Sequence, residues 1–283
     1  MPAIAELSTF KGLPAVRLSA PDGATATVLM HGAHVVSWRP AGGEEQLFLS
    51  EQSAYGAGQA VRGGVPVIFP QFAARGPLPR HGFARTRAWQ LVEADTGTED
   101  ALAVLRLQDD DSTRALWQHG FEVELTARVG GSRLDLELAV TNTGSLPFGF
   151  SAALHTYLSV RDLPSLRLEG LQGLTYTDSA EGGTQHTEAH AELAIAGEID
   201  RIYHRATQPL TLREPGRRVH LSSEGFADVV VWNPGPTKGA ALADMPPEAW
   251  RQMLCVEAGA IESPVRLGPA EGWVGRQSLV CVQ

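Results

Sequence analysis

The stretch FEVELTARVGGSRLDLELAV, residues 121–140, decides the fold class of this chain. Apolar side chains occupy alternate positions on both sides of a central glycine pair: Phe121, Val123, Leu125, Ala127 and Val129 before it, and Leu134, Leu136, Leu138 and Val140 after it. Charged side chains fill most of the intervening positions. A period of two indicates strands with one buried face, and two glycines between such strands are typical of a hairpin turn. The stretch therefore predicts a half-buried antiparallel hairpin.

Short alternating or β-branched segments continue on both sides of this hairpin. They cover residues 24–38 with a bend at 31–33, then 88–92, 102–108, 148–160, 166–178, 199–203, 226–232 and 278–282, and a second hairpin joins 210–212 to 219–221. Residues 182–192 are polar and predict a loop, while residues 244–254 predict one or two helical turns. Strands of about five residues with almost no helix predict an all-β antiparallel β-sandwich. Because no linker or repeat divides the chain, we expect one domain over residues 1–283.

The composition excludes several classes of function. A net charge of −9 argues against a general role on nucleic acid or on a membrane surface. No apolar run approaches the roughly 20 residues that span a bilayer, and residues 1–6 lack the pattern of a signal peptide. Cys255 and Cys281 show neither metal-ligand spacing nor a disulfide framework, so we expect buried free thiols. These features predict a soluble, cytoplasmic protein with no nucleic-acid or membrane partner.

Three arginines stand among residues that otherwise look buried. Arg62 lies in the segment 61–70, which is rich in glycine, proline and apolar residues, and Arg80 and Arg85 flank residues 81–84. A buried charge needs a partner or a ligand, and the planar guanidinium suits a carboxylate or a phosphate. Each arginine taken alone could equally form a surface pair with one of the 32 acidic residues. The cluster as a whole predicts a site that grips an anionic small molecule.

Two titratable residues lie in apolar surroundings. His155 sits within ALHTYL, residues 153–158, where a histidine is either hydrogen-bonded structurally or held for proton transfer. Glu257 lies in the apolar segment 253–260. A buried glutamate is rare without a partner, and desolvation raises its pKa towards the range of a useful base. Asp200 is a weaker candidate, because Arg201 beside it is also consistent with an exposed ion pair.

Metal and cofactor motifs do not stand out in the sequence. His31 and His34 would fall on opposite faces of a strand, and we interpret His186 and His190 as solvated because their segment is polar and rich in glycine. The chain shows no phosphate-binding loop with lysine, no nucleophile elbow and no dinucleotide fingerprint. The sequence therefore predicts neither a metal nor a cofactor.

Seven segments in chain order resemble the aldose 1-epimerase superfamily, most closely its branch of glucose-6-phosphate 1-epimerases, also called D-hexose-6-phosphate mutarotases. They are residues 31–38, 61–66, 81–85, 154–157, 200–203, 231–234 and 253–258, which together span nearly the whole chain. The resemblance implies a galactose-mutarotase-like β-sandwich (supersandwich), with the sugar in a groove across one sheet. It also implies an isomerase that interconverts the α and β anomers of a hexose 6-phosphate, with glucose 6-phosphate as the expected substrate.

The same resemblance assigns roles to individual residues. His155 would be the general acid that protonates the ring oxygen, and Glu257 the base that takes the proton from the anomeric hydroxyl. We expect these two groups on opposite sides of the bound ring, with an anion anchor to hold it. His81 would orient the sugar and Asp200 would bind a hydroxyl.

The phosphate clamp is implied in the same way. Arg62 and Arg85 match positions that hold the sugar phosphate in this branch of the family. Relatives carry glutamine or serine where this chain has Arg80. Arg80 is therefore either a third phosphate contact or a sign of a different substrate.

Three other functions fit part of the pattern. A catalytically silent sugar-binding sandwich would use the same groove, and a mutarotase of unphosphorylated aldoses would not need the arginines. A glycoside hydrolase usually needs two carboxylates, whereas the candidates here are one carboxylate and one histidine. We expect a monomer whose partner is a small sugar phosphate.

Overall fold

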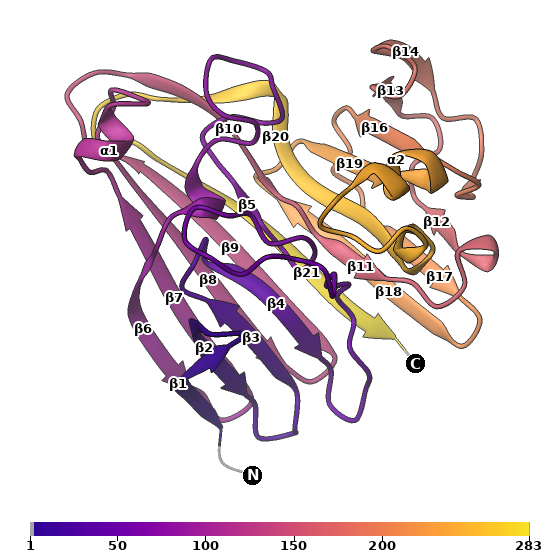
Figure 1. The fold of residues 1–283 in the computed structure, drawn as a ribbon, viewed down its shortest axis with the longest axis horizontal. Coiled ribbons are helices and arrows are strands. Elements are labelled where there is room, and N and C mark those ends of the chain that lie inside the picture. Colours follow the sequence, from indigo (N-terminus) through magenta and orange to yellow (C-terminus); the bar gives the residue numbers. More distant parts are fainter. Residues whose placement is uncertain (1–2, 283) are drawn as a thin grey trace.

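Antiparallel strands dominate the computed structural model, which describes residues 3–282 (Figure 1). The strands form three sheets of nine, eight and four strands. The predicted hairpin lies within the nine-stranded sheet as β8 (Phe121–Gly130) and β9 (Arg133–Asn142). Its register pairs Val123 with Val140 and Leu125 with Leu138, and all four side chains are buried. The alternating pattern thus gives the hairpin its buried face, as predicted.

The nine-stranded sheet runs in the order β15-β12-β17-β18-β21-β9-β8-β7-β6. Its other members are β15 (Glu192–Leu193), β12 (Arg167–Glu169), β17 (Leu210–Glu214), β18 (Arg217–Glu224), β21 (Gly272–Val282), β7 (Ala101–Gln108) and β6 (Gln90–Thr96). The second predicted hairpin is β17 with β18, and that prediction is confirmed.

The eight-stranded sheet carries the residues of functional interest. Its main path is β14-β13-β16-β19-β20-β10-β5, and β11 pairs with β20 beside this path. The members are β14 (Thr184–Thr187), β13 (Thr175–Asp178), β16 (Ile199–Tyr203), β19 (Asp228–Asn233), β20 (Met253–Leu267), β10 (Phe148–Leu154), β5 (Val67–Ile68) and β11 (Tyr157–Ser159).

A four-stranded sheet packs on part of the nine-stranded one. It contains β1 (Ile4–Phe10), β2 (Leu13–Ser19), β3 (Thr25–Leu29) and β4 (His34–Arg39) in that order. Strands β2 and β3 contact β7 and β8, and Figure 1 shows these indigo strands over the magenta ones. The helical segments are short: α1 (Asp111–Arg114), α2 (Gly235–Ala241), and the 3₁₀ turns Ala84–Thr86, Leu163–Ser165 and Ala249–Gln252.

Two hydrophobic clusters lie on the two faces of the eight-stranded sheet. The larger one takes side chains from all three sheets, among them Val16, Leu125 and Val256. The smaller one contains Ile68, Phe72, Ala153, Ile202, Val230 and Ile261. Along β19, Val229 and Val231 belong to the larger cluster and Val230 to the smaller one, so the smaller cluster marks the opposite face. That opposite face is the one on which the candidate site is built.

Some local predictions were wrong. The segment 166–178 was expected as one strand, but it splits into β12 and β13, which belong to different sheets. Gly170 and Gly173 lie between them with φ of 101° and 82°, conformations that glycine adopts readily and that redirect the chain. The predicted loop 182–192 contains β14 and the start of β15. The helical turn predicted within 244–254 is present as the 3₁₀ turn Ala249–Gln252, although β20 already begins at Met253.

Candidate active site

Strand register aligns a row of side chains across the eight-stranded sheet. Asp200 on β16 pairs with Trp232 on β19, Trp232 pairs with Cys255 on β20, and Cys255 pairs with Tyr157 on β11. Directly paired residues project to the same face of a sheet. Glu257 lies two residues beyond Cys255 along β20 and therefore shares that face. Residues separated by up to 100 positions in sequence thus line one surface.

His155 and Glu257 are in direct contact at this surface. The His155 Nε2 lies 3.2 Å from the Glu257 Oε1, and the side chains are only 9% and 1% exposed. The expectation that the two groups stand apart on opposite sides of a sugar ring is therefore not met, because no ring fits between these atoms. Their other polar atoms, Nδ1 and Oε2, have no hydrogen-bond partner within residues 3–282. Both atoms are buried polar atoms that no group in this part of the chain satisfies.

Burial drives the pKa values of this pair in opposite directions. Desolvation lowers the pKa of His155 well below 6.5, and the nearby His81, Arg85 and Arg62 lower it further. Desolvation raises the pKa of Glu257 well above 4.5, with a further contribution from Asp200. Both shifts favour a protonated carboxyl beside a neutral imidazole. The pair thus holds one proton that can move between Oε1 and Nε2.

Aromatic rings fix the orientation of His155. The Tyr157 ring stacks on the imidazole at 4.7 Å with the planes 9° apart, and the Trp232 ring meets it edge-on at 6.2 Å. His81 lies on another side, with its ring centroid 5.6 Å from that of His155. The backbone N–H of His155 donates to the Pro66 carbonyl, which ties this segment to the glycine-rich stretch. The imidazole has little freedom to turn.

His81 is held in a strained backbone conformation with φ of 67°, which non-glycine residues seldom adopt. Its Nδ1 accepts a hydrogen bond from the Ala73 N–H at 3.3 Å. Burial lowers the pKa of His81 to about 3, and Arg85, Arg80 and Arg62 contribute, so the ring is neutral at pH 7. A neutral imidazole that accepts at Nδ1 carries its proton on Nε2. His81 can therefore donate one hydrogen bond to a ligand.

Arg62 is tied to two partners. Its Nε and Nη2 both lie 3.1 Å from the Asp244 Oδ2, and its Nη1 donates to the Tyr157 hydroxyl at 3.0 Å. Burial lowers the pKa of Arg62, but Tyr157 and Asp244 outweigh it and the pKa ends above the usual value. The charge of Arg62 is therefore largely compensated within the protein.

Arg85 differs from Arg62 because it has no carboxylate partner within residues 3–282. Its Nη2 donates to the Arg80 carbonyl at 3.0 Å, and its Nε is buried without a partner. Burial lowers the pKa of Arg85, and the charges of Arg62 and Arg80 lower it further. A half-buried guanidinium with no carboxylate partner, close to two other arginines, favours the binding of an anion. This geometry makes Arg85, with Arg80, the stronger anchor for a negatively charged ligand.

Two glycines let the arginine stretch lie close to β4. A Cβ on Gly64 would meet the Val35 carbonyl oxygen at 2.2 Å, and φ is 62°. The Gly64 carbonyl accepts the N–H of Tyr157, and the Gly63 carbonyl accepts the His34 Nε2 proton at 2.7 Å. These bonds hold the segment that carries Arg62 next to β11, where the Arg62 side chain reaches the Tyr157 hydroxyl.

Asp200 lies at the far end of the row. Its side chain is 22% exposed, and its Oδ2 lies 4.0 Å from the Lys238 Nζ. Burial raises the pKa of Asp200, while Lys238 and Arg80 oppose the rise. The alternative of an exposed ion pair with Arg201 is wrong, because Arg201 instead binds Asp178 and Glu188. Asp200 is free of that pairing and faces the site.

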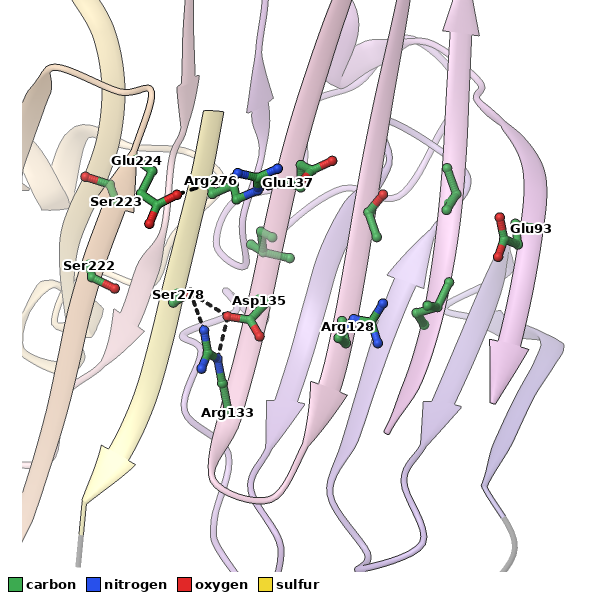
Figure 2. A pocket seen from close by; sticks show the side chains of 14 residues that line it. Glu93, Arg128, Arg133, Asp135, Glu137, Ser222, Ser223, Glu224, Arg276 and Ser278 are labelled. Carbon is green, nitrogen blue, oxygen red and sulfur yellow. Dashed lines mark hydrogen bonds and ion pairs between the residues drawn. The ribbon is translucent and has the colours of Figure 1, made fainter. Parts of the chain in front are cut away.

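A hollow of about 560 Å³ lies elsewhere, on the solvent side of the nine-stranded sheet (Figure 2). Each arginine that lines it has a carboxylate partner: Arg133 pairs with Asp135, Arg276 with Glu137 and Glu224, and Arg128 with Asp100 outside the hollow. None of the seven candidate residues lines it. Because the arginines that line it within residues 3–282 are all paired, the hollow offers no uncompensated cation to an anionic ligand.

Comparison with known proteins shows the family of the chain. The sequence matches the family Aldose 1-epimerase over residues 14–279. A relative from Cenchrus ciliaris, provisionally named glucose-6-phosphate 1-epimerase, is 34% identical over 286 residues, which cover 98% of this chain and 87% of the relative. The crystal structure of a provisionally named mutarotase from Salmonella typhimurium has a TM-score of 0.91 at 26% identity, covering 99% of this chain and 94% of that one. A galactose mutarotase-like protein from Clostridium acetobutylicum shares the fold, with a TM-score of 0.78 at 14% identity over 100% of this chain and 99% of its own.

The fold, the family match and the relatives together define an anomer-interconverting isomerase built on a galactose-mutarotase-like β-sandwich. The chain belongs to the aldose 1-epimerase family. The predicted fold class, family and type of reaction are confirmed. No helix within residues 3–282 is long and apolar enough to cross a membrane.

Sequence reasoning missed four residues of the site: Tyr157, Trp232, Cys255 and Asp244. Strand parity could have found two of them, since Tyr157 and Cys255 lie two positions from His155 and Glu257. Trp232 and Asp244 give no such local signal, because pairing between distant strands and loops brings them in. Both cysteines are free as predicted, but Cys281 is only half-buried.

Proposed function

We propose that the chain interconverts the α and β anomers of a hexose 6-phosphate, with glucose 6-phosphate as the leading candidate. His155 and Glu257 would transfer the protons. Arg85 and Arg80 would make most of the contacts to the phosphate. Arg62 would contribute a donor that Asp244 and Tyr157 hold in place. One observation carries the phosphate claim, namely the half-buried Arg85 guanidinium, whose buried Nε has no partner and which pairs with no carboxylate within the described residues.

The contact between the two catalytic groups suits this reaction. The anomeric hydroxyl oxygen and the ring oxygen are both bonded to C1 of the sugar, so adjacent acid and base atoms can reach both. Ring opening needs the carboxylate–imidazolium form of the pair, which arises when the shared proton moves from Oε1 to Nε2 over 3.2 Å. Burial favours the opposite, neutral form, so this move costs free energy before the ring opens.

In the proposed step, Glu257 takes the proton of the anomeric hydroxyl while His155 gives its proton to the ring oxygen. The bond between C1 and the ring oxygen breaks, and an open-chain aldehyde forms. Rotation about C1–C2 and reversal of both proton transfers close the ring as the other anomer. Each positioned acid or base typically contributes ~10²–10⁴-fold, and proton numbers balance over the cycle.

His81 and Asp200 complete the proposed substrate site. The Nε2 proton of His81 would bind a sugar oxygen and orient the ring. The Asp200 carboxylate, on the other side of Trp232, would accept a sugar hydroxyl. The chain-wide core and the two free thiols further support one domain over residues 1–283 in a reducing, cytoplasmic setting, and we propose a monomer.

The decisive experiment is exchange NMR between anomers of glucose 6-phosphate and of free glucose, with and without the protein. We expect faster exchange of the phosphorylated sugar, and we expect high salt to weaken the acceleration because the anchor is ionic. Equal, salt-independent acceleration of both sugars would favour a mutarotase of unphosphorylated aldoses. Undiminished sugar binding with no acceleration at all would favour the silent binding sandwich.

A further inference from the structure

Cys255 lies beside the catalytic pair but has no role in the proposed reaction. Its thiol is fully buried, and its Sγ, a nitrogen of His155 and a carboxylate oxygen of Glu257 all lie within 4.8 Å of one another. Among the side chains of residues 3–282, these three are the His, Cys, Asp or Glu residues whose ligand atoms lie close enough together to hold a metal ion. The distance of 100 residues between His155 and Cys255 hides the trio in the sequence, where the cysteines show no metal-ligand spacing.

We propose that His155, Cys255 and Glu257 form a binding site for one Zn²⁺-like divalent cation, and that this cation inhibits the enzyme. The site has an imidazole nitrogen, a thiolate and a carboxylate, three ligand types that Zn²⁺ prefers. Three protein ligands leave a fourth position open for water. Occupancy would remove both proton-transfer groups at once.

The geometry of the pair already fits a tetrahedral centre. Metal–nitrogen and metal–oxygen bonds of about 2.1 Å at tetrahedral angles place the two ligand atoms roughly 3.4 Å apart. The observed separation between the His155 Nε2 and the Glu257 Oε1 is 3.2 Å. The Cys255 Sγ lies within 4.8 Å of the other two ligand atoms, so it would have to move closer to complete the coordination.

The buried Oε2 of Glu257 supplies an independent reason to expect a ligand here. This atom has no hydrogen-bond partner within the described residues, although the side chain is 1% exposed. A divalent cation would compensate the negative charges of a thiolate and a carboxylate, so the Cys255 thiol and the Glu257 carboxyl would each release a proton to solvent on binding. The step involves no change of oxidation state.

Nearby arginines set a limit on the affinity. Arg62 is compensated by Asp244, but Arg80 and Arg85 are not paired with carboxylates within the described residues and repel a cation. Asp200 acts in the opposite direction, since its charge is felt at Glu257 and at Cys255. We therefore expect reversible binding that is weaker than that of a dedicated structural zinc site.

The direct test titrates the full-length protein with Co²⁺ and follows thiolate-to-metal charge-transfer absorption in the near ultraviolet. We expect the band in the wild-type protein and in Cys281→Ala, and its loss in Cys255→Ala. A wild-type protein without the band, or a Cys255→Ala protein that keeps it, would overturn the proposal. Should Cys255→Ala fail to fold by circular dichroism, Cys255→Ser serves in its place, because a serine hydroxyl gives no thiolate band.

A second readout uses Zn²⁺ inhibition of anomer exchange, measured relative to each protein's own metal-free rate. We expect Cys255→Ala to need at least about tenfold more Zn²⁺ than the wild type, since even loss of an outer-shell partner typically costs 10–100-fold in affinity. Chelation by EDTA should restore the rate. Because the Co²⁺ band needs no turnover, its outcome stands even if the proposed hexose-phosphate activity is absent.

Discussion

The imidazole of His155 and the phenol ring of Tyr157 lie face to face, 4.7 Å between centroids and 9° from parallel, while the Tyr157 hydroxyl accepts a hydrogen bond from Arg62. This relationship connects the proton-transfer pair to the arginine cluster through one rigid ring. A ligand that moves Arg62 therefore also acts on Tyr157, the side chain that holds the His155 ring in place.

Tyr157→Phe keeps the ring and removes the hydroxyl. A hydrogen bond to a charged group is worth roughly 1.5–3 kcal/mol, so we expect KM for glucose 6-phosphate to rise about tenfold with little change in kcat. Tyr157→Leu also removes the stacking and should lower kcat. Steady-state anomer exchange distinguishes the two variants, and equal kcat in both would show that the stack does not position His155.

His155→Ala and Glu257→Gln should each lower kcat by ~10²–10⁴-fold, because each group carries one of two coupled proton transfers. We expect the double variant to be hardly slower than either single variant, since groups that act as a unit are not additive. If the fold loss of kcat in the double variant equals the product of the losses in the two single variants, the two residues act independently. Circular dichroism checks that all three remain folded.

Arg85→Met should weaken substrate binding and stabilise the free protein. Removing a half-buried, unpaired charge relieves its partial desolvation, so we expect the free energy of unfolding to rise by at most about 1 kcal/mol. KM for glucose 6-phosphate should rise by roughly 10–100-fold, which corresponds to losing a charge-assisted contact of about 1.5–3 kcal/mol. Urea unfolding and anomer exchange measure the two effects.

Arg128→Met is the matched control for that experiment. Arg128 lies on the distant nine-stranded sheet, where it forms an exposed ion pair with Asp100. An exposed pair contributes at most ~1 kcal/mol, so stability should change little and KM should not change. A rise of KM in both variants would point to a general charge effect rather than a phosphate contact.

The stability of the protein should fall between pH 6.5 and about 4. Burial lowers the pKa of His34 to about 4 from 6.5, so in this window the unfolded chain binds a proton that the folded chain cannot. The stabilising contribution is complete above pH 6.5 and is lost as the pH falls to about 4, which amounts to about 3 kcal/mol. His81, with its pKa lowered to about 3, adds an effect of the same sign.

Urea unfolding of the wild type and of His34→Gln at pH 7 and pH 4.5 measures this contribution. The glutamine amide can still donate to the Gly63 carbonyl but does not titrate. We expect the loss of stability between the two pH values to be smaller in the variant. An identical loss in both proteins would show that His34 does not drive the acid sensitivity.

Local pattern was enough for the parts of the fold that depend on neighbours in sequence. The hairpin at 121–140 follows from alternation around two glycines, and the bend at 31–33 lies between β3 and β4 as predicted. The split of 166–178 into two sheets could not be foreseen, because it depends on which distant strand each half meets. The site follows the same rule, since His155 and Glu257 are recognisable as polar residues in apolar segments of the sequence, whereas Trp232 and Asp244 are not.

The sequence by itself determined the strand class, the buried face of each clear strand, and the family to which the chain belongs. Only the tertiary structure decided that His155 touches Glu257 directly, that Asp244 compensates Arg62 while Arg85 stays unpaired, and that Cys255 joins the catalytic pair. The physical reason is that alternation is a local property of the chain, whereas the contacts of the site are long-range. Alternation sets which way a side chain points, but the partner it meets depends on strand pairing between residues 100 positions apart.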